Sequence, residues 1–485
     1  MIAFYLLLLL PLVGSLLMLI IGGSKFSGYC NIFITIMTFV SSIFVTMFFL
    51  KHGSYTIMGQ QFYIDAFNLL MIGLTTFTTM TTAFFPNTYM WNNVVISRIN
   101  RSQLLLYHFM YQLFTLIALI TLSTNNLGIL WVSLEGATLA TVLLISMYRT
   151  KEAIEAAWKY FILCIVGIGL ALFGIILVYF SATQALAQNN TRMLWSILVQ
   201  SAKNLDPAII KVASIFILVG YGTKIGLAPL HNWLPDAYSE SPTPVTVLLS
   251  GLLSNVAFYA LIRFKLLADH ALNNNFVGNL IIGFGVLSFI IGAVLIQRQH
   301  NIKRLFAYSS IEHMGLIAIA FGIGGKTAIF IGLFYILIHS IVKSATFMIA
   351  GNIVQQGGTQ ILEKNHGVIV NQPQLGWGLI IATLALAAVP PFSIFTSELM
   401  LLVVSMKFSP FLALVLIVGL IIALGGLLRN IPLVVYGENQ KNALVKVKTC
   451  NLPTFLHLSL ALILGIYLPS TFQLLLQVAT SLLTK

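Results

Sequence analysis

Long apolar stretches run along almost the whole chain and are separated by short polar segments. A transmembrane helix needs about 20 consecutive, mostly apolar residues. By that criterion the pattern predicts an all-α polytopic membrane protein with about fourteen transmembrane helices. They are expected over residues 2–22, 29–50, 62–85, 103–122, 125–147, 153–180, 208–234, 242–262, 275–296, 303–323, 327–354, 374–406, 410–435 and 454–480.

The composition narrows the class of protein further. Apolar residues make up 59% of the chain and charged residues 8%, and the mean hydropathy is +0.97. A soluble globular domain carries about 25% charged residues, so this chain lacks the polar side chains to cover a soluble surface. Disordered chains are poor in apolar residues, which excludes disorder. The first apolar stretch lacks a basic leader and is too long for a signal peptide, so it is expected to be a retained helix.

The distribution of the 25 Lys and Arg residues indicates an orientation in the membrane. With the N-terminus outside, thirteen of them fall in inner loops, eight in outer loops and four within spans. Because cytoplasmic loops are enriched in Lys and Arg, this bias favours a cell inner membrane with both termini on the outer side. The net charge of +13 is scattered over short loops without interleaved aromatics, so no nucleic-acid partner is expected.

The three cysteines, Cys30, Cys164 and Cys450, lie far apart and form no CxxC pair. This spacing predicts no iron–sulfur cluster, structural zinc site or disulfide framework in the chain. We therefore expect no cofactor and no metal here, and any redox metals would belong to other subunits.

Two of the predicted spans are interrupted. The seventh carries Gly226 and Pro229, and the twelfth carries Pro390 and Pro391. Proline removes a backbone donor and clashes with the preceding turn, and a broken backbone at membrane depth survives only where it is buried in protein or lines a wet cavity. Paired interrupted helices are typical of inverted repeats with an ion path at the midplane. Two unrelated proline kinks are the alternative.

The two breaks are five spans apart, which predicts two inverted five-helix repeats. Helices 1–3 are expected in residues 1–101 and helices 4–8, the first repeat, in residues 102–265. Helices 9–13, the second repeat, are expected in residues 275–436, and helix 14 in residues 450–485.

Ionisable residues deep in the spans are the first candidates for function, because a charge at the bilayer centre costs at least ~2.5–3.5 kcal/mol. Glu135 has no charged residue within ten positions, so its partner is expected on another helix. Lys224 falls in the break of the seventh span. Burial lowers the pKa of a lysine and a nearby carboxylate raises it, so a carboxylate that moves or titrates would make Lys224 bind or release a proton. The alternatives are a neutral Glu135 with one interhelical hydrogen bond and a Lys224 that snorkels to the interface.

The second candidate group lies further along the chain. His339 and Lys343 are four residues apart and therefore share a helix face, which is typical of a proton relay. Glu398 follows the Pro390-Pro391 break and is expected to end the path. A satisfied core histidine and an interfacial carboxylate are the alternatives for His339 and Glu398.

Secondary candidates lie nearer the ends of the spans. Lys159 follows Glu155 by four residues, so an intrahelical ion pair is as good an interpretation as a channel role. Glu312 and His313 are expected to be half-wetted, and His231 lies where the seventh span ends.

Several motifs resemble one family along essentially the whole chain. The stretch KIGLAPLHNWLPDAY from Lys224 to Tyr238 resembles the seventh helix of the antiporter-like subunits of respiratory complex I and of the Mrp cation/proton antiporters. IKRLFAYSSIEHMG from Ile302 resembles their tenth helix. HSIVKSATF from His339 and PPFSIFTSELMLL from Pro390 resemble their eleventh and twelfth helices.

Within that superfamily, the segment from Trp131 to Ile162 and the SSIEHMG motif look most like the F component of hydrogenase-4-type complexes. The resemblance implies that Glu135 and Lys224 form the pair between the fifth and seventh helices. It also implies that His339 and Lys343 form the relay of the eleventh helix, and that Glu398 is the exit residue of the twelfth.

One position departs from the family pattern. Many relatives carry a lysine in the eighth helix, roughly where Ser254 and Asn255 stand here. Since Asn255 cannot carry a positive charge, either water bridges Lys224 to His339 or the two half-channels are poorly connected.

The sequence therefore predicts a proton-translocating membrane-arm subunit of a membrane-bound oxidoreductase complex, of the hydrogenase-4, formate hydrogenlyase or complex I type. Its expected partners are other membrane-arm subunits and a peripheral redox arm. The first alternative is a subunit of an Mrp-type cation/proton antiporter. The second is a structural spacer that has lost transport, for which Asn255 is the only support.

Overall fold

Short polar side chains start six of the long helices in the computed structural model, which describes residues 2–186, 191–436 and 449–484. Asp65 and Asn100 each form a capping box with the residue three positions later. Asn126, Thr150, Asp206 and Asn301 cap the helices that follow them. These caps satisfy backbone N–H groups that a helix end otherwise leaves unpaired.

The described helices up to the middle of the chain are α1 (Ile2–Ile21), α2 (Ser27–His52), α3 (Ala66–Val95), α4 (Arg101–Ser123), α5 (Leu127–Ile145), η1 (Ser146–Tyr148), α6 (Lys151–Ala185), α7 (Trp195–Gln200), η3 (Ala202–Asn204), α8 (Pro207–Ile225), α9 (Trp233–Glu240), α10 (Thr243–Leu248), η4 (Leu249–Leu253) and α11 (Ser254–Leu272). The remaining ones are α12 (Phe276–Ile296), α13 (Ile302–Ile323), α14 (Gly325–Gly357), η5 (Leu362–Lys364), α15 (Val368–Asn371), α16 (Pro373–Leu386), α17 (Ser393–Phe408), α18 (Pro410–Tyr436), α19 (Leu452–Ile466) and α20 (Ser470–Leu483). Strands β1 (Tyr55–Ile57) and β2 (Phe62–Ile64) form an antiparallel hairpin with Tyr55 opposite Ile64.

The chain is a multi-pass membrane protein. In the part of the chain that the structure describes, twelve helices are long and apolar enough to cross a membrane, and the bent pair α19 and α20 would make a thirteenth span. The predicted twelfth span is two shorter helices, α16 and α17. The all-α polytopic fold is thus confirmed, whereas the count of about fourteen spans stays a prediction.

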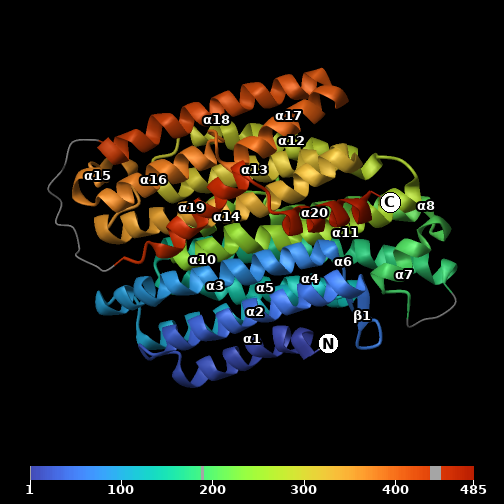
Figure 1. Ribbon diagram of the computed structural model, residues 1–485, viewed down its shortest axis with the longest axis horizontal. Coiled ribbons are helices and arrows are strands. Elements are labelled where there is room, and N and C mark those ends of the chain that lie inside the picture. The colour runs from blue at the N-terminus through green and yellow to red at the C-terminus, as the bar shows by residue number, and fades with distance from the viewer. Residues whose placement is uncertain (1, 187–190, 437–448, 485) are drawn as a thin grey trace.

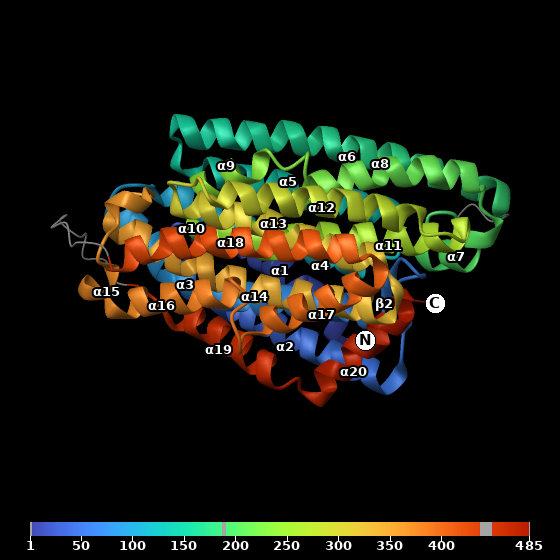
Figure 2. The same cartoon turned by 90° about the horizontal axis from the view of Figure 1, so that it is seen from above.

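The helices lie side by side in an elongated bundle (Figure 1). The first half of the bundle consists of α4 to α11 and the second half of α12 to α18. They meet around α10–α11, α13 and α14. The most apolar stretches of these helices are 89–100% buried. At the edges, α1, α6 and α18 are only 33–39% buried and expose many large apolar side chains, as lipid-facing helices do. The ends of the chain lie towards the same end of the bundle, beside β1 and α7 (Figures 1 and 2).

Three predicted spans are broken. The span expected over 208–234 ends as a helix at Ile225, and a turn leads into α9. The span over 374–406 is interrupted between Leu386 and Ser393, as its prolines predict. The last span bends by 75° between α19 and α20, which the sequence pattern does not indicate. The start predicted for the third span at residue 62 is wrong, because residues 62–64 belong to β2.

A buried ion pair fixes the middle of α11 to the start of α3. The Arg263 guanidinium donates to both carboxylate oxygens of Asp65, at 2.7 and 2.9 Å, and it stacks on Trp195 and Tyr259. Bidentate geometry and aromatic faces suit a buried arginine. The predicted span over 242–262 leaves Arg263 in a loop, whereas the structure has it buried within α11.

Glycines allow α12 and α13 to touch backbone to backbone. A Cβ atom at Gly292 would lie 2.6 Å from the Glu312 backbone nitrogen, and one at Gly285 would lie 2.8 Å from the Gly315 carbonyl oxygen. Small residues at helix interfaces in membranes permit such close approach. This contact sets the position of α13 and of the Glu312 side chain that it carries.

We predict that Gly292→Ala destabilises the protein, since the added methyl group meets backbone that cannot move aside. Overpacking of this kind costs about 1–3 kcal/mol. The thermal unfolding midpoint in mild detergent measures the effect. Gly283→Ala on the same helix is the control, because its Cβ would have nothing within 4 Å. Equal midpoints for the two variants would contradict the close approach.

Candidate functional site

Glu135 and Lys224 meet between α5 and α8. The Lys224 ammonium lies 3.8 Å from Glu135 Oε2 and donates to the Leu134 carbonyl oxygen at 3.3 Å. Lys224 is completely buried, whereas the Glu135 side chain is 17% exposed. The helix ends two residues later at Gly226, whose φ of +85° is left-handed and therefore favours glycine. The break thus holds the lysine next to a carboxylate of another helix.

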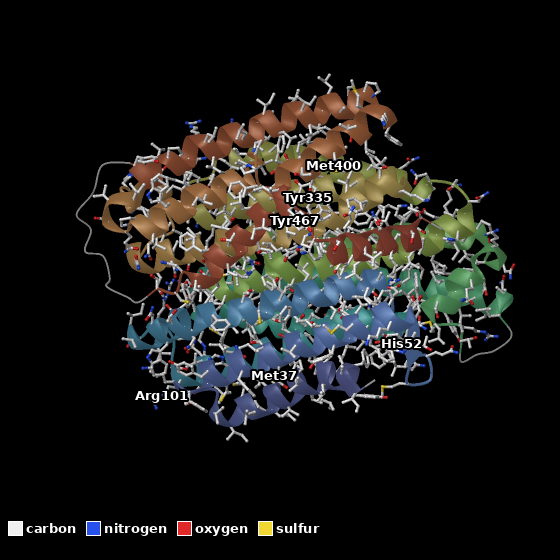
Figure 3. All side chains as sticks on the ribbon, in the orientation of Figure 1. Met37, His52, Arg101, Tyr335, Met400 and Tyr467 are labelled. Atoms are coloured by element: carbon white, nitrogen blue, oxygen red, sulfur yellow. The ribbon has the colours of Figure 1, made fainter. Side chains whose placement is uncertain are left out.

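A second group of polar side chains lies in the second half, around Tyr335 of α14 (Figure 3). The Tyr335 hydroxyl donates to Glu398 Oε1 at 2.8 Å and lies 2.7 Å from His313 Nδ1. The same histidine nitrogen is 3.8 Å from the Glu398 carboxylate. Side chains of α13, α14 and α17 therefore form one hydrogen-bonded group.

Glu312, His339 and Lys343 extend this group. Glu312 Oε2 lies 3.8 Å from His313 Nε2, and the rings of His313 and His339 are 5.6 Å apart between centroids. The Lys343 ammonium donates to the Phe306 carbonyl oxygen at 3.0 Å. Both ring nitrogens of His339 are buried without a hydrogen-bond partner among the described residues. Buried polar groups ordinarily form hydrogen bonds with protein or with water. We therefore expect water beside the His339 ring.

The second group reaches the flank of the bundle. A pocket of about 220 Å³ is lined by Glu312 and Glu398 and by residues of the break between α16 and α17. Its rim includes Leu399 and Ile421, which are exposed on the outer surface of α17 and α18. Glu135 is partly exposed on α5. Carboxylates thus lie near the surface at two separate edges of the molecule.

A π-helical turn, η4, lies where the two halves meet. The Gly251 carbonyl oxygen accepts from Asn255 Nδ2 at 2.7 Å and from the Ser340 hydroxyl at 2.6 Å. Such turns leave a carbonyl free for other donors and are frequent at functional sites. Asn255 and Ser340, which belong to different halves, thus share the Gly251 carbonyl oxygen, so Asn255 lies at the junction. Its Oδ1 has no partner among the described residues.

The remaining sequence candidates lie elsewhere or in other surroundings. Lys159 binds Glu155 at 2.6 Å and Asp236 at 3.2 Å on the surface, so the structure has the ion pair that was one of the two interpretations. The half-wetted environment predicted for Glu312 and His313 is wrong, because their side chains are only 3% and 2% exposed. His231 is buried in the turn before α9, and its Nδ1 has no partner among the described residues.

Sequence reasoning missed two buried residues. Tyr335 precedes His339 by four positions, and this helical spacing was the available signal. Lys303 was not singled out either, yet it is 2% exposed and its ammonium donates to the carbonyl oxygens of Ser239 and Ser241. Nothing in its local sequence separates it from its half-buried neighbour Arg304.

The two groups can exchange protons with their neighbours, because glutamate, lysine, histidine and tyrosine each bind and release one. Among the described residues, no three His, Cys, Asp or Glu side chains are arranged to hold a metal ion. Ionisable residues within membrane helices are rare, pair with one another in the interior and mark ion or proton pathways.

Comparison with known proteins decides the family. The family model described as NADH:quinone oxidoreductase/Mrp antiporter, TM, matches residues 124–423. The chain belongs to this family. A relative described as hydrogenase-4 component F homolog, from Methylacidiphilum infernorum, is 43% identical over 95% of this chain and 96% of its own length. The predicted resemblance to the F component of hydrogenase-4 is thereby confirmed.

A more distant relative matches in sequence, and a solved structure matches in fold. The D component of a Na(+)/H(+) antiporter from Alkalihalophilus pseudofirmus is 29% identical over 74% of this chain and 72% of its own. A chain in the structure of the membrane-bound sulfane sulfur reductase, an archaeal respiratory membrane complex, superposes with a TM-score of 0.87. It covers 99% of this chain and 98% of its own at 23% identity. Family membership and fold therefore agree.

We predict that Tyr335→Phe destabilises the second half, since it removes the hydroxyl that links His313 to Glu398. Each buried polar group left unpaired costs about 1–3 kcal/mol. The free energy of unfolding in mixed micelles is the measurement. Tyr308→Phe on α13 is the control, because the described residues provide no hydrogen bond to the Tyr308 hydroxyl; a loss as large there would contradict the assignment.

Proposed function

We propose that this chain is a proton-translocating membrane-arm subunit of a membrane-bound oxidoreductase complex, of the hydrogenase-4/formate hydrogenlyase or complex I type. The observation that carries the proposal is a set of ionisable side chains within the helices. The partly exposed Glu135 and the buried Lys224 lie beside the first break, and the buried His339, Lys343 and Glu398 lie near the second. The similarity to a hydrogenase-4 component F homolog supports the choice of complex.

Proton movement in this proposal begins at the first break. Lys224 lies close enough to Glu135 to exchange with it as the 3.8 Å pair opens and closes. Separation from the carboxylate disfavours the charged form of a buried lysine, which then gives up its proton. The proton passes through water near Asn255 to His339, whose unpartnered ring nitrogens can take it up.

The second group completes the transfer. His339, His313 and Tyr335 are close neighbours, and Lys343 lies on the same helix face as His339. Tyr335 already donates to Glu398, which lines the pocket at the flank. In this scheme Glu398 releases the proton outward. Glu312 and Lys343 supply the opposite charges that balance a proton held between them.

The proposed domain organisation follows the two breaks. Residues 1–101 hold three preceding helices, 102–265 and 275–436 hold the two inverted repeats, and 450–485 holds the last helix. The placement of one broken span in each of the two middle units supports this division.

We further propose a cell inner membrane with both termini outside. Arg101 lies at one end of the bundle and His52 towards the opposite end (Figure 3), as this orientation requires. The inner loops then carry the excess of Lys and Arg. Three of the inner lysines, Lys441, Lys446 and Lys448, lie outside the described residues.

The partners follow from the proposal. The chain would be joined by other membrane-arm subunits at its flanks, where Glu135 and the Glu398 pocket come near the surface. A peripheral redox arm would supply the driving force, with its redox centres on other chains. An Mrp-type antiporter subunit is the second candidate, favoured by the Na(+)/H(+) antiporter relative.

Purification of the intact complex through a tag on this chain separates the two candidates. Co-purified nickel and iron, with hydrogen-dependent dye reduction, is the result expected for a hydrogenase membrane arm. Co-purified flavin and iron with quinone reduction would place it in a complex I type assembly. Small membrane partners without metal or flavin would overturn the oxidoreductase proposal in favour of the antiporter.

We predict that Lys224→Met abolishes proton movement in inverted vesicles while the amount of assembled complex stays the same, because methionine occupies the space without carrying a proton. Fluorescence quenching of a pH-sensitive dye after addition of the electron donor measures the movement. Lys211→Met is the matched control, since Lys211 lies exposed on the same helix. Full quenching in the Lys224 variant would contradict proton transfer through Lys224.

A further inference from the structure

The segment from Gly226 to Ser241, here called the break segment, follows Lys224 in the first half but is bonded to the second. The Ala228 backbone N–H donates to the Ser288 hydroxyl of α12 at 2.8 Å. The Arg304 guanidinium of α13 donates to Asp236 Oδ1 at 2.7 Å. Helices of the second half therefore hold the segment at its beginning and near its end.

Lys303 adds an unusual bond to the same segment. Its ammonium donates to the carbonyl oxygens of Ser239, at 3.3 Å, and Ser241, at 2.7 Å, where α9 ends. No carboxylate lies within 4 Å of this buried lysine among the described residues. The last carbonyls of a helix carry partial negative charge, so they take the place of a carboxylate. A buried lysine with no other evident use thus binds α9 to α13.

The other end of α9 is tied to the helix that carries Lys224. The Trp233 indole N–H donates to the Thr223 carbonyl oxygen at 2.8 Å, one residue before Lys224. Trp233 also packs against Tyr160 of α6. A displacement of Lys224 and the end of α8 would therefore move the start of α9.

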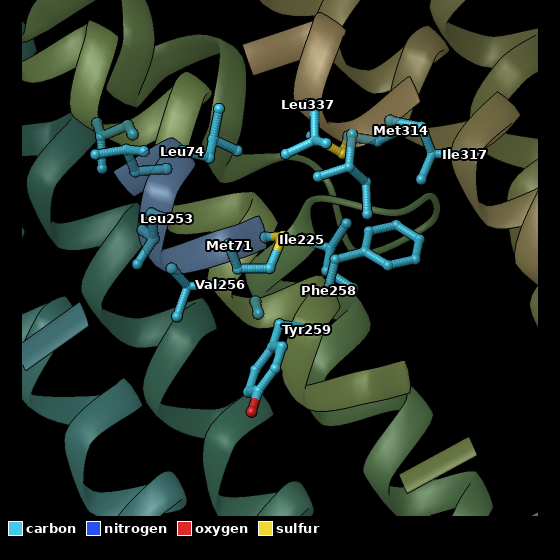
Figure 4. Close-up of a cluster of buried hydrophobic side chains, with 14 of the residues drawn as sticks. Met71, Leu74, Ile225, Leu253, Val256, Phe258, Tyr259, Met314, Ile317 and Leu337 are labelled. Carbon is cyan, nitrogen blue, oxygen red and sulfur yellow. The ribbon is translucent and has the colours of Figure 1, made fainter. Parts of the chain in front are cut away.

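Side chains between the two polar groups offer little direct connection. Figure 4 shows apolar residues of both halves in one cluster, among them Ile225, Leu253 and Phe258 from the first half and Met314 and Leu337 from the second. Asn255 at the junction is engaged with the Gly251 carbonyl. A contact that transmits movement would couple the halves without a continuous row of ionisable groups.

We propose that Asp236, Ser239, Ser241, Lys303 and Arg304 form a clamp between α9 and α13 that couples the Glu135–Lys224 pair to the second half. The inference rests on the proposed function. α13 carries Glu312 and His313 about two and a half turns beyond Lys303. It packs backbone to backbone against α12, so in this scheme the two helices would shift together. Opening of the pair at the first break would thus change the position of the second polar group. Lys303 and Arg304 are positioning residues in this scheme.

Asp236 provides an internal control for the clamp. Its Oδ2 also binds Lys159 of α6, within the first half, at 3.2 Å. Arg304 and Lys159 are comparably exposed, at 38% and 48% of the side chain. The two cations share one carboxylate, but only Arg304 connects it to the second half.

The test is the number of protons moved per electron, measured in inverted vesicles that contain the intact complex. A variant that merely lowers the amount of complex leaves this ratio unchanged. Arg304→Gln is expected to lower it to less than half, whereas Lys159→Gln keeps the wild-type ratio. An Arg304→Gln ratio equal to that of the wild type, or an equal loss in both variants, would overturn the clamp.

A double-mutant cycle strengthens the test. If Asp236 and Arg304 act as a pair, Asp236→Asn with Arg304→Gln should lower the ratio no further than Arg304→Gln alone. Additive losses would overturn the pairing.

The Lys303 bonds are tested with two variants. Lys303→Arg keeps a donor for the carbonyl oxygens and should retain a higher proton-to-electron ratio than Lys303→Met. Equal ratios in the two variants would count against the Lys303 bonds. A wild-type complex that moves no protons would overturn the proposed function, and the clamp with it.

Discussion

Ionisable side chains in a low-dielectric interior require partners from other helices, and the arrangement of this bundle follows from that requirement. Breaking a buried charge pair leaves an uncompensated charge and costs about 3–5 kcal/mol. Glu135 meets Lys224 across two helices, and Asp65 meets Arg263 across a separation of 198 residues in the chain. Each pair fixes a contact between helices, but the distance between the charged atoms differs between the two pairs. The Asp65–Arg263 bonds are short and bidentate, whereas the 3.8 Å gap between Glu135 and Lys224 suits a pair that opens.

The breaks in the helices serve the same requirement. Where α8 ends at Gly226, the lysine before it lies at the end of a helix beside a carboxylate of α5. Where α16 and α17 are separated, the first turns of α17 present Glu398 to Tyr335. Backbone groups released by each break find partners within the protein, as the bond from Ala228 to Ser288 shows. Interrupted backbone and buried charge therefore occur together because both need surroundings sheltered from lipid.

Much of this organisation could be predicted from the sequence, since charges stand out in apolar stretches. Glu135 and Lys224 were predicted from their charge, and the two breaks from the prolines within apolar stretches. The rest depends on what covers each helix face, and a single sequence does not contain that information. Glu312 was expected to be half-wetted, yet its side chain is only 3% exposed where Gly292 lets α12 lie against it. Tyr335 was overlooked because tyrosine is common in apolar helices, and its importance appears only with the partners brought by α13 and α17.

The central claim is that the Glu135 carboxylate, which meets Lys224 beside the first break, changes its protonation or hydrogen bonding when electrons flow. Infrared difference spectroscopy of the intact complex, at rest and after addition of the electron donor, tests this directly, with Glu135→Gln used to assign the band. We expect a carboxyl band that changes during turnover and is missing from the Glu135→Gln complex. Turnover with identical difference spectra in both complexes would contradict the exchange between Glu135 and Lys224.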